Sequence, residues 1–241
     1  MLPRVADAYR TGGGVPYAAY GLAFRHGQGH INRPAFTHEL PSDWLAAMPD
    51  VVTHLEHAQH PRVADLGCGQ GFSTIAIAGA FLNTWVDGLD IDEASVADAR
   101  RHAADAGLDG RVRFLRADAT ELADHGPYDL ILILEALHDM TDPADALRAA
   151  RGALTPHGTV LVVDERVADT FTAPGDEIER MMYGWSVTHC LPTQLAEQPS
   201  AALGTVMRSH TVRALAADAG YTRIDVLPVV NDFFRLYRLD P

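Results

Sequence analysis

Three glycines at alternate positions are the residues most suited to holding a ligand against the main chain. Gly67, Gly69 and Gly71 lie in VADLGCGQGFS, directly after an apolar run and before a helical pattern. Glycine lets a strand turn tightly into a helix and lets a ligand approach the backbone. The spacing is G-x-G-x-G rather than the G-x-G-x-x-G of NAD enzymes, which disfavours a pyrophosphate site. A purely structural turn remains an alternative for this motif alone.

Two carboxylates follow the next two apolar runs of the chain. Asp90 stands nineteen residues after Gly71, where an open α/β sheet places a side chain that can accept hydrogen bonds from both hydroxyls of a ribose. Asp118, in RADAT, could accept from an adenine amino group while the Ala119 amide serves a ring nitrogen. Each acid alone could instead be a solvated loop end or a helix cap. Their occurrence on consecutive strand ends favours one nucleoside site.

The elements that must position these residues alternate between short apolar runs and helical patterns, as in a doubly wound, mostly parallel α/β sheet. Two further runs, separated by the turn formers Asn231 and Asp232, predict a terminal antiparallel hairpin with a two-residue turn. The predicted strands cover residues 62–67, 85–90, 112–117, 128–136, 159–165, 223–230 and 233–239.

Two segments lie outside this alternation. Residues 1–60 are expected to form a cap that includes a helix from about Ser42, with Ser42 or Asp43 as its N-cap. The cap precedes a main domain over residues 61–241. Within it, about forty residues (166–208) separate the fifth strand from the next helix, predicted at 211–220, which is long for a plain connection. Their apolar and aromatic content predicts a lid over the sheet edge rather than a disordered linker.

The motifs VADLGCGQG, GLDID, RADA and YDLILILEALHD, in this order, resemble the motif series of class I S-adenosylmethionine (SAM)-dependent methyltransferases. The resemblance covers roughly residues 60–240. It implies a seven-stranded sheet, with the glycine loop facing the methionine half of SAM, Asp90 on the ribose, Asp118 and Ala119 on the adenine, and Glu135 beside the sulfonium. The cofactor-binding residues that it implies are Asp65, Gly67, Cys68, Gly69, Gly71, Ser73, Asp90, Ile91, Asp118, Ala119 and Glu135.

A narrower resemblance links FRHGQGHINRPAF, DERVADTFTAPGD and YGWSVTHCLP to a bacterial methyltransferase group in which a winged helix often precedes the catalytic domain. About sixty residues before the first strand leave no room for that domain, so a DNA-binding role is not expected. In this group the cap helps to enclose SAM. The resemblance therefore implies Tyr20, Gln28 and Asn32 as further lining residues.

Transfer of a methyl group from SAM requires an acceptor held in line with the S–CH₃ bond, in a pocket that excludes water. If the acceptor is a hydroxyl, a histidine is a suitable base near neutral pH. His138 follows the fourth strand and is the first candidate; His189, in the lid, is the second. Each could instead be a packed structural residue. The expected product is S-adenosylhomocysteine (SAH).

Two other functions compete with methylation of an O or N atom of a small molecule. A magnesium-dependent O-methyltransferase could use Asp139, Asp164 and Glu165, because carboxylates are ligands that Mg²⁺ prefers. A SAM-binding regulator would keep the cofactor site without methyl transfer. The twelve histidines lack the spacing of a zinc site, so no metal is expected.

The composition of the chain limits the kinds of partner that we expect it to bind. The formal net charge of −13 disfavours nucleic acid, which binds to basic surfaces. Two cysteines, no apolar run long enough to span a membrane and no signal peptide predict a cytoplasmic protein. A small-molecule acceptor is the expected partner, and the aromatic and glycine-rich cap makes a homodimer plausible.

Overall fold

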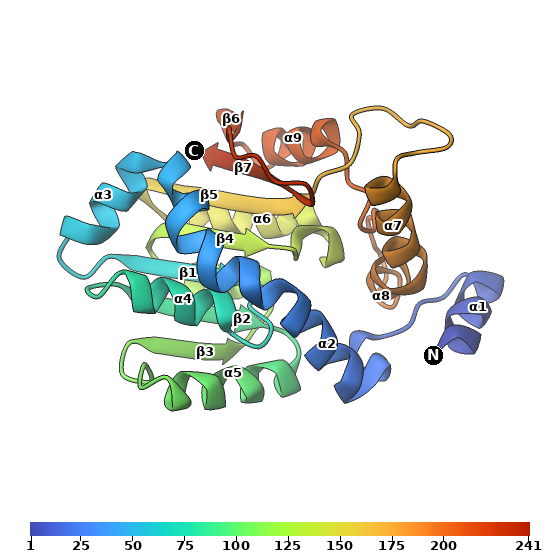
Figure 1. Cartoon of the computed structure of the whole chain (residues 1–241), viewed down its shortest axis with the longest axis horizontal. Coiled ribbons are helices and arrows are strands. Elements are labelled where there is room, and N and C mark those ends of the chain that lie inside the picture. The colour runs from blue at the N-terminus through green and yellow to red at the C-terminus, as the bar shows by residue number, and fades with distance from the viewer.

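The computed structural model describes residues 1–241 and contains one seven-stranded sheet, in the order β3-β2-β1-β4-β5-β7-β6, between two layers of helices (Figure 1). Strands β1 to β5 are parallel, and β7 is antiparallel to both of its neighbours. This confirms the predicted doubly wound sheet with a terminal antiparallel pair. The strands are β1 (Arg62–Leu66), β2 (Trp85–Asp90), β3 (Val112–Arg116), β4 (Tyr128–Leu134), β5 (Leu154–Glu165), β6 (Arg223–Val226) and β7 (Phe234–Asp240).

Strand β4 lies at the centre of the sheet, between β1 and β5. Its apolar run, Leu130 to Leu134, is buried because helices cover both faces of the strand. The strand order reverses between β1 and β4. In open α/β sheets, ligands bind beyond the carboxyl ends of the strands at such a point.

One face of the sheet is covered by the N-terminal half of the chain and the other by helices that follow β3. Apolar residues of η2 and α3 join the same core as those of α4 and α5. The first layer contains η2 (Ala35–Trp44), η3 (Leu45–Ala47), α3 (Pro49–His57), α4 (Phe72–Ala80) and α5 (Glu93–Asp105). The second contains η4 (Ala119–Asp124), α6 (Pro143–Gly152) and α9 (Ser209–Asp218).

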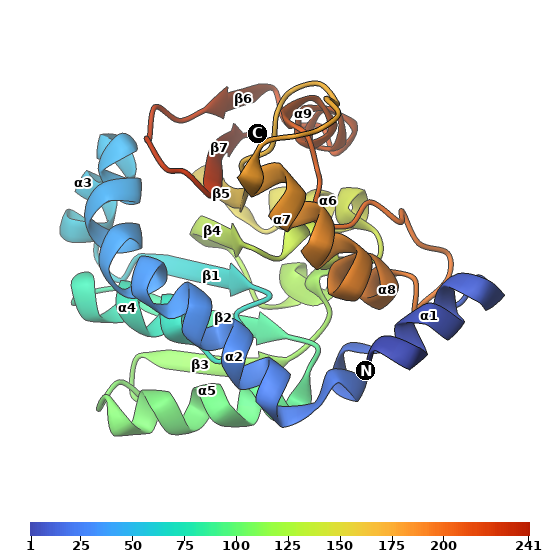
Figure 2. The same ribbon diagram turned by 45° about the vertical axis from the view of Figure 1, so that its right-hand side comes forward.

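The remaining helices gather at the carboxyl ends of the parallel strands. Helix α2 crosses this edge of the sheet, while α7 and α8 lie beside it with α1 at their far side (Figure 2). The segment that follows β5 thus reaches the N-terminal segment. These helices are α1 (Leu2–Thr11), η1 (Tyr17–Tyr20), α2 (Gly21–Pro34), η5 (Leu137–Asp139), α7 (Glu177–Trp185), η6 (Ser186–Cys190) and α8 (Leu191–Gln194).

Two local predictions are wrong. No helix begins at Ser42: this residue lies inside η2, its hydroxyl donates to His38 O at 2.6 Å, and α3 begins only at Pro49. The hairpin has no two-residue turn either, because residues 227–233 connect β6 to β7. There the Asn231 side chain accepts hydrogen bonds from the amides of Phe233 and Phe234, both at 2.9 Å. Hydrogen bonds between the Asn231 side chain and the backbone thus stabilise a longer loop, instead of the tight turn that Asn231 and Asp232 suggested.

None of the helices combines the length and the apolar character that crossing a membrane would require.

Candidate functional site

A cavity of about 340 Å³ lies at the carboxyl ends of β1 to β4. Each of these strands contributes the segment that follows it, and α2 supplies part of the opposite wall. The four segments that line the cavity cover residues 66–70, 89–92, 117–120 and 134–136, followed by 139–142 beyond η5. Gly67, Gly69 and both predicted carboxylates therefore share one cavity, whereas Gly71 lies outside its lining.

The glycine loop requires glycine at each of its three positions. Gly67, Gly69 and Gly71 have φ values of 70°, 51° and 79°, in the left-handed region that other residues rarely adopt. Space is also limiting, since a Cβ on Gly67 would lie 2.5 Å from the Ala136 Cβ and one on Gly71 2.6 Å from the Phe114 ring. The loop thereby brings β1 into α4 with its backbone against the cavity.

Asp90 is held by the main chain at the cavity wall. Its two carboxylate oxygens accept hydrogen bonds from the Gly69 and Asp92 amides, each at 2.8 Å. Burial raises the pKa of Asp90 to about 6, so the carboxylate is charged at neutral pH but protonates under mildly acidic conditions. A charged acceptor fixed in this way suits vicinal hydroxyl donors.

Asp118 and Ala119 line the cavity beyond β3. Asp118 also caps η4: its side chain accepts from the Thr120 amide at 2.9 Å, and the Glu121 side chain accepts from the Asp118 amide at 2.8 Å. The helix-cap alternative is thus correct for this residue. It leaves Asp118 fixed beside the cavity.

Other residues of the motif lie behind the loop rather than in the cavity wall. Asp65, 1% exposed, accepts hydrogen bonds from the hydroxyls of Ser73 and Thr74, both at 2.6 Å. Burial raises the pKa of Asp65 to about 6 despite these two donors. Cys68 does reach the cavity, and burial raises its thiol pKa well above the ordinary value, which makes it a poor nucleophile.

The cap contributes more to the cavity than the sequence indicated. Gln28 and Asn32 line it, whereas Tyr20 does not: the Tyr20 hydroxyl donates to Thr188 O at 2.9 Å. Tyr17 takes that place in the wall and donates to Gln28 Oε1 at 3.2 Å. Further lining residues with no signal in the sequence are Arg25, Gly29, Phe36, Thr193 and Glu197.

Asp98 of α5 fastens the cap to the main domain. Its Oδ2 atom lies 3.3 Å from Arg25 Nε, 3.2 Å from His26 Nε2 and 3.0 Å from Gln70 Nε2. Burial opposes ionisation of Asp98, but hydrogen bonds from Gln70, Arg101 and His26 outweigh it and lower its pKa to about 2. Asp98 is therefore charged across the working pH range and connects α2, the glycine loop and α5.

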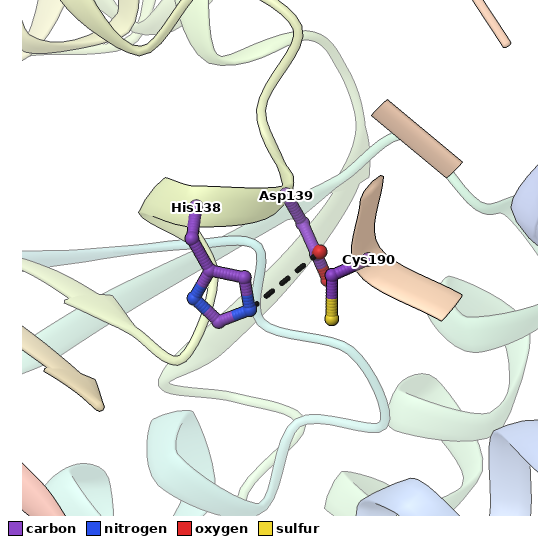
Figure 3. Close-up of side chains that lie close together, drawn as sticks. All are labelled: His138, Asp139 and Cys190. Atoms are coloured by element: carbon purple, nitrogen blue, oxygen red, sulfur yellow. Dashed lines mark ion pairs between the residues drawn. The ribbon is translucent and has the colours of Figure 1, made fainter. Parts of the chain in front are cut away.

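Three carboxylates contact the His138 ring beyond β4 and β5, and a fourth acid, Glu135, follows β4. His138 Nδ1 lies 2.8 Å from Asp164 Oδ1 and 3.5 Å from Glu165 Oε2, while Nε2 lies 3.5 Å from Asp139 Oδ1 (Figure 3). Burial opposes protonation of the ring, but Asp164, Glu165 and Asp139 outweigh it and raise the pKa of His138 well above its ordinary value. The fourth acid, Glu135, lines the cavity, and its burial raises its pKa to about 8.

Neither histidine candidate lines the cavity. His138 is 3% exposed, and it is Asp139, one residue on, that reaches the wall. His189 is 1% exposed and packs against Tyr20 and Phe24, with ring centroids 4.7 and 4.4 Å away. Burial lowers the pKa of His189, so this ring is neutral at physiological pH.

The acids of the magnesium alternative divide between the two sides of the His138 ring. Asp164 and Glu165 form a compact group with His138, whereas Asp139 forms another with His138 and Cys190. Asp139, Asp164 and Glu165 therefore do not converge on one point as an all-carboxylate site would require.

Sequence comparisons agree with this geometry. A family model described as a methyltransferase domain matches residues 57–209. Trans-aconitate 2-methyltransferase of Streptomyces coelicolor is 32% identical over 152 residues, which are 63% of this chain and 46% of the relative. 27-O-demethylrifamycin SV methyltransferase of Amycolatopsis mediterranei is 38% identical over 104 residues, which are 43% of this chain and 38% of the relative. The chain thus spans less than half the length of these curated relatives.

Solved structures share the fold over nearly the whole chain. An O-methyltransferase family protein from Burkholderia thailandensis superposes with a TM-score of 0.67 at 16% identity, over 99% of this chain and 67% of that one. An O-methyltransferase from neocarzinostatin biosynthesis was solved with SAH and 1,4-dihydroxy-2-naphthoic acid. It superposes with a TM-score of 0.60 at 21% identity, over 98% of this chain and 66% of that one. This chain belongs to the methyltransferase domain family, and its fold is that of the class I methyltransferases, whose cofactor is SAM.

Proposed function

We propose that this chain binds SAM in the cavity beyond β1 to β4 and transfers the methyl group to an oxygen of a small molecule, releasing SAH. One observation carries the proposal: two glycines of the loop, Gly67 and Gly69, line the same cavity as the three acids Asp90, Asp118 and Glu135. This is the arrangement that one adenosyl cofactor requires.

The contacts of each residue suggest its part in binding. Asp90 accepts from the ribose hydroxyls, because its carboxylate is already oriented by two amides. Asp118 and the Ala119 amide bind the adenine at the β3 end of the cavity. The loop from Gly67 to Gly71 presents its backbone to the methionine half. Glu135, at the end of the central strand, lies beside the sulfonium, whose positive charge favours an ionised carboxylate there.

The acceptor would enter beside Asp139, the member of the buried acid cluster that follows Glu135 along the wall. Attack by the acceptor oxygen forms the C–O bond as the S–CH₃ bond breaks, and the electron pair stays on sulfur. The hydroxyl proton passes to Asp139 and then to solvent. His138 lies outside the cavity, and the acids around its ring raise its pKa, so we assign it a positioning role for Asp139.

The enclosure of the cavity supports a small acceptor. Helix α2 covers it on one side, and Thr193 and Glu197 of the lid region on another, which narrows the opening that a macromolecule would need. The names of similar proteins also favour a small acceptor: one relative is named for a rifamycin, and one solved structure contains a dihydroxynaphthoic acid. Both compounds carry hydroxyl groups, which favours oxygen over nitrogen as the methylated atom.

Calorimetric titration of the purified chain with SAM and SAH tests the cofactor site, and SAH formation against a panel of hydroxylated aromatic and carboxylic compounds tests the transfer. We expect binding of both ligands and turnover of at least one compound. Absence of SAM binding would contradict the whole proposal. Tight binding with no SAH formed from any compound would favour the regulatory alternative instead.

We also propose a cytoplasmic protein that forms a homodimer and binds no nucleic acid. Both cysteines are free, as in a reducing compartment, and the net charge is −13. Exposed apolar side chains on the cap and lid support self-association; they include Leu2, Tyr9, Phe171, Met181, Tyr183 and Val187. Sedimentation equilibrium measures the mass directly, and a monomer at all concentrations would contradict the dimer.

A further inference from the structure

A second group of ligand-type atoms lies beside the cavity, on the Nε2 side of the His138 ring. Figure 3 shows the side chains of His138 and Asp139 close to that of Cys190, which belongs to η6. One ligand atom from each of these residues lies within 4.8 Å of the other two. Cys190 comes from a segment about fifty residues further along the chain, so only the tertiary fold creates this group.

The His138 ring is oriented as in many metal sites. Its Nδ1 lies 2.8 Å from Asp164 Oδ1, which fixes the ring and leaves Nε2 directed at Asp139, 3.5 Å away. Histidines that bind metals commonly place the other ring nitrogen against a carboxylate in this way, which sets the tautomer and increases the basicity of the ligand. Asp164 itself is completely buried.

A buried carboxylate oxygen without a hydrogen-bond partner in the same place also points to a ligand. Asp139 Oδ1 is buried and has no hydrogen-bond partner. On the other side of Cys190, the buried ring of His189 places its Nδ1 3.4 Å from Cys190 Sγ. The nearest group to Asp139 Oδ1 is His138 Nε2, at 3.5 Å, so a cation between the carboxylate, the ring and the sulfur would give this oxygen a close partner.

We propose that His138 Nε2, the Asp139 carboxylate and Cys190 Sγ bind a zinc ion. Mixed nitrogen, oxygen and sulfur donors suit Zn²⁺, whereas Mg²⁺ prefers oxygen alone. Bonds of about 2.0–2.3 Å in a tetrahedron separate ligand atoms by roughly 3.3–3.8 Å, so the three atoms need to approach only slightly. Of the three ligands only Asp139 lines the cavity, so the proposal places the fourth, open position on the Asp139 side, as in zinc sites that bind water or substrate.

Binding of the ion displaces two protons to the buffer, one from His138 Nε2 and one from the Cys190 thiol. The carboxylates that favour protonated His138 favour Zn²⁺ at the same nitrogen for the same electrostatic reason. If zinc is bound, Asp139 would be one of its ligands, and the ion would supply a Lewis acid for the oxygen of an acceptor hydroxyl, whose proton would then pass to solvent rather than to Asp139. That catalytic use rests on the proposed methyl transfer; the zinc site itself does not.

The experiment uses the full chain, freed of metal with a chelator and titrated with Co²⁺ as a spectroscopic substitute for Zn²⁺. We expect a charge-transfer band from thiolate to cobalt in the near ultraviolet that saturates at one equivalent and disappears when Zn²⁺ is added. Cys190→Ser should lose the band and still bind SAH. Cys68→Ser is the matched control, because it removes the other buried thiol and should keep the band.

Asp139→Asn tests the site without touching the thiol: the band should persist with an affinity for Zn²⁺ weaker by about 10-fold or more. Absence of the band in the unmodified chain, its persistence in Cys190→Ser, or an unchanged affinity in Asp139→Asn would each overturn the proposal. Failure of the methyltransferase function would be seen separately, as absence of SAM binding or turnover while the cobalt band remains.

Discussion

At the scale of single residues, Asp90 is the side chain on which cofactor binding depends most, because its orientation is set before any ligand arrives. Asp90→Ala should weaken SAH binding by about 10- to 100-fold, in line with roughly 1.5–3 kcal/mol for hydrogen bonds to a charged group. Titration calorimetry measures this. Asp105→Ala, at the exposed end of α5, is the control and should bind SAH like the unmodified chain. Equal affinities in both variants would show that Asp90 does not contact the ligand.

The same residue predicts how binding depends on pH. The pKa of Asp90 is raised to about 6, and only the ionised carboxylate accepts two hydroxyl hydrogen bonds. SAH affinity should therefore be constant above neutrality and fall as the pH drops through about 6. Repeating the titration on Asp90→Asn tests the assignment, since the dependence in that range should become flatter. An unchanged profile in the variant would assign the effect to another group.

Residue types and spacing predicted the glycine loop and the two acids because these features follow strand ends, which the sequence marks clearly. They did not predict the surroundings of His138. Its ring is enclosed by acids from β5 and η5, and such enclosure depends on how separate segments pack. Tyr17 was missed for a similar reason: Tyr17 and Tyr20 belong to the same short helix, and only its orientation decides which ring reaches the cavity.

At the scale of elements, the contact between α2 and the glycine loop determines how closely the cap covers the cofactor. A Cβ on Gly29 would lie 2.2 Å from Gln70 Oε1, and Gln70 is bonded to Asp98. Gly29→Ala should therefore separate α2 from the loop and weaken SAH binding. Gly27→Ala, on the same helix with no atom nearby, should instead raise the stability by about 0.5–1 kcal/mol. Calorimetry and urea unfolding of the two variants distinguish a specific contact from a general effect of helix propensity.

Asp98 gives a second test of the same element. Asp98→Ala removes the acceptor shared by Arg25, His26 and Gln70, so amides of α2 should exchange hydrogen about 10-fold faster or more. Hydrogen-exchange mass spectrometry locates the change. Arg101→Ala is the matched control, because it removes an Asp98 contact within α5 alone. Equal exchange of α2 in both variants would contradict the fastening role.

The elements themselves were largely predictable. Seven strands lie within a few residues of the apolar runs that predicted them, because a buried parallel strand needs a continuous apolar stretch. The wrong predictions concern connections. Ser42 is a good N-cap residue by type, yet the chain is already helical there, and Asn231 caps a longer loop rather than forming a tight turn.

At the scale of the whole molecule, buried acids should make stability depend on pH in an unusual direction. The pKa values of Asp65, Asp90 and Glu135 are raised by burial to about 6, 6 and 8. Between their unfolded and folded pKa values the folded chain holds more protons, so the free energy of unfolding should fall as the pH rises from about 4 to 8. The pKa of His138 is also raised, so its titration likewise lowers the free energy of unfolding as the pH rises above the ordinary pKa of histidine.

Urea unfolding of the SAM-free protein between pH 5 and 8 measures this slope. Glu135→Gln should flatten it and raise the stability at pH 8 by about 1–3 kcal/mol, because it removes a buried charge. Glu177→Gln, at the exposed start of α7, should leave the slope unchanged. A stability that rises with pH in the unmodified chain would show that these acids are paired more strongly than their surroundings indicate.

The position of β7 between β5 and β6 has a consequence for biosynthesis. Strand β6 is translated before β7, yet β7 is its sole neighbour in the sheet. During translation β6 consequently has nothing to pair with, and a nascent chain halted before Phe234 would also leave the edge of β5 bare. Ribosome-stalled chains that carry C-terminal extensions of increasing length should therefore acquire protease resistance in this region abruptly, once the extension lets β7 leave the exit tunnel.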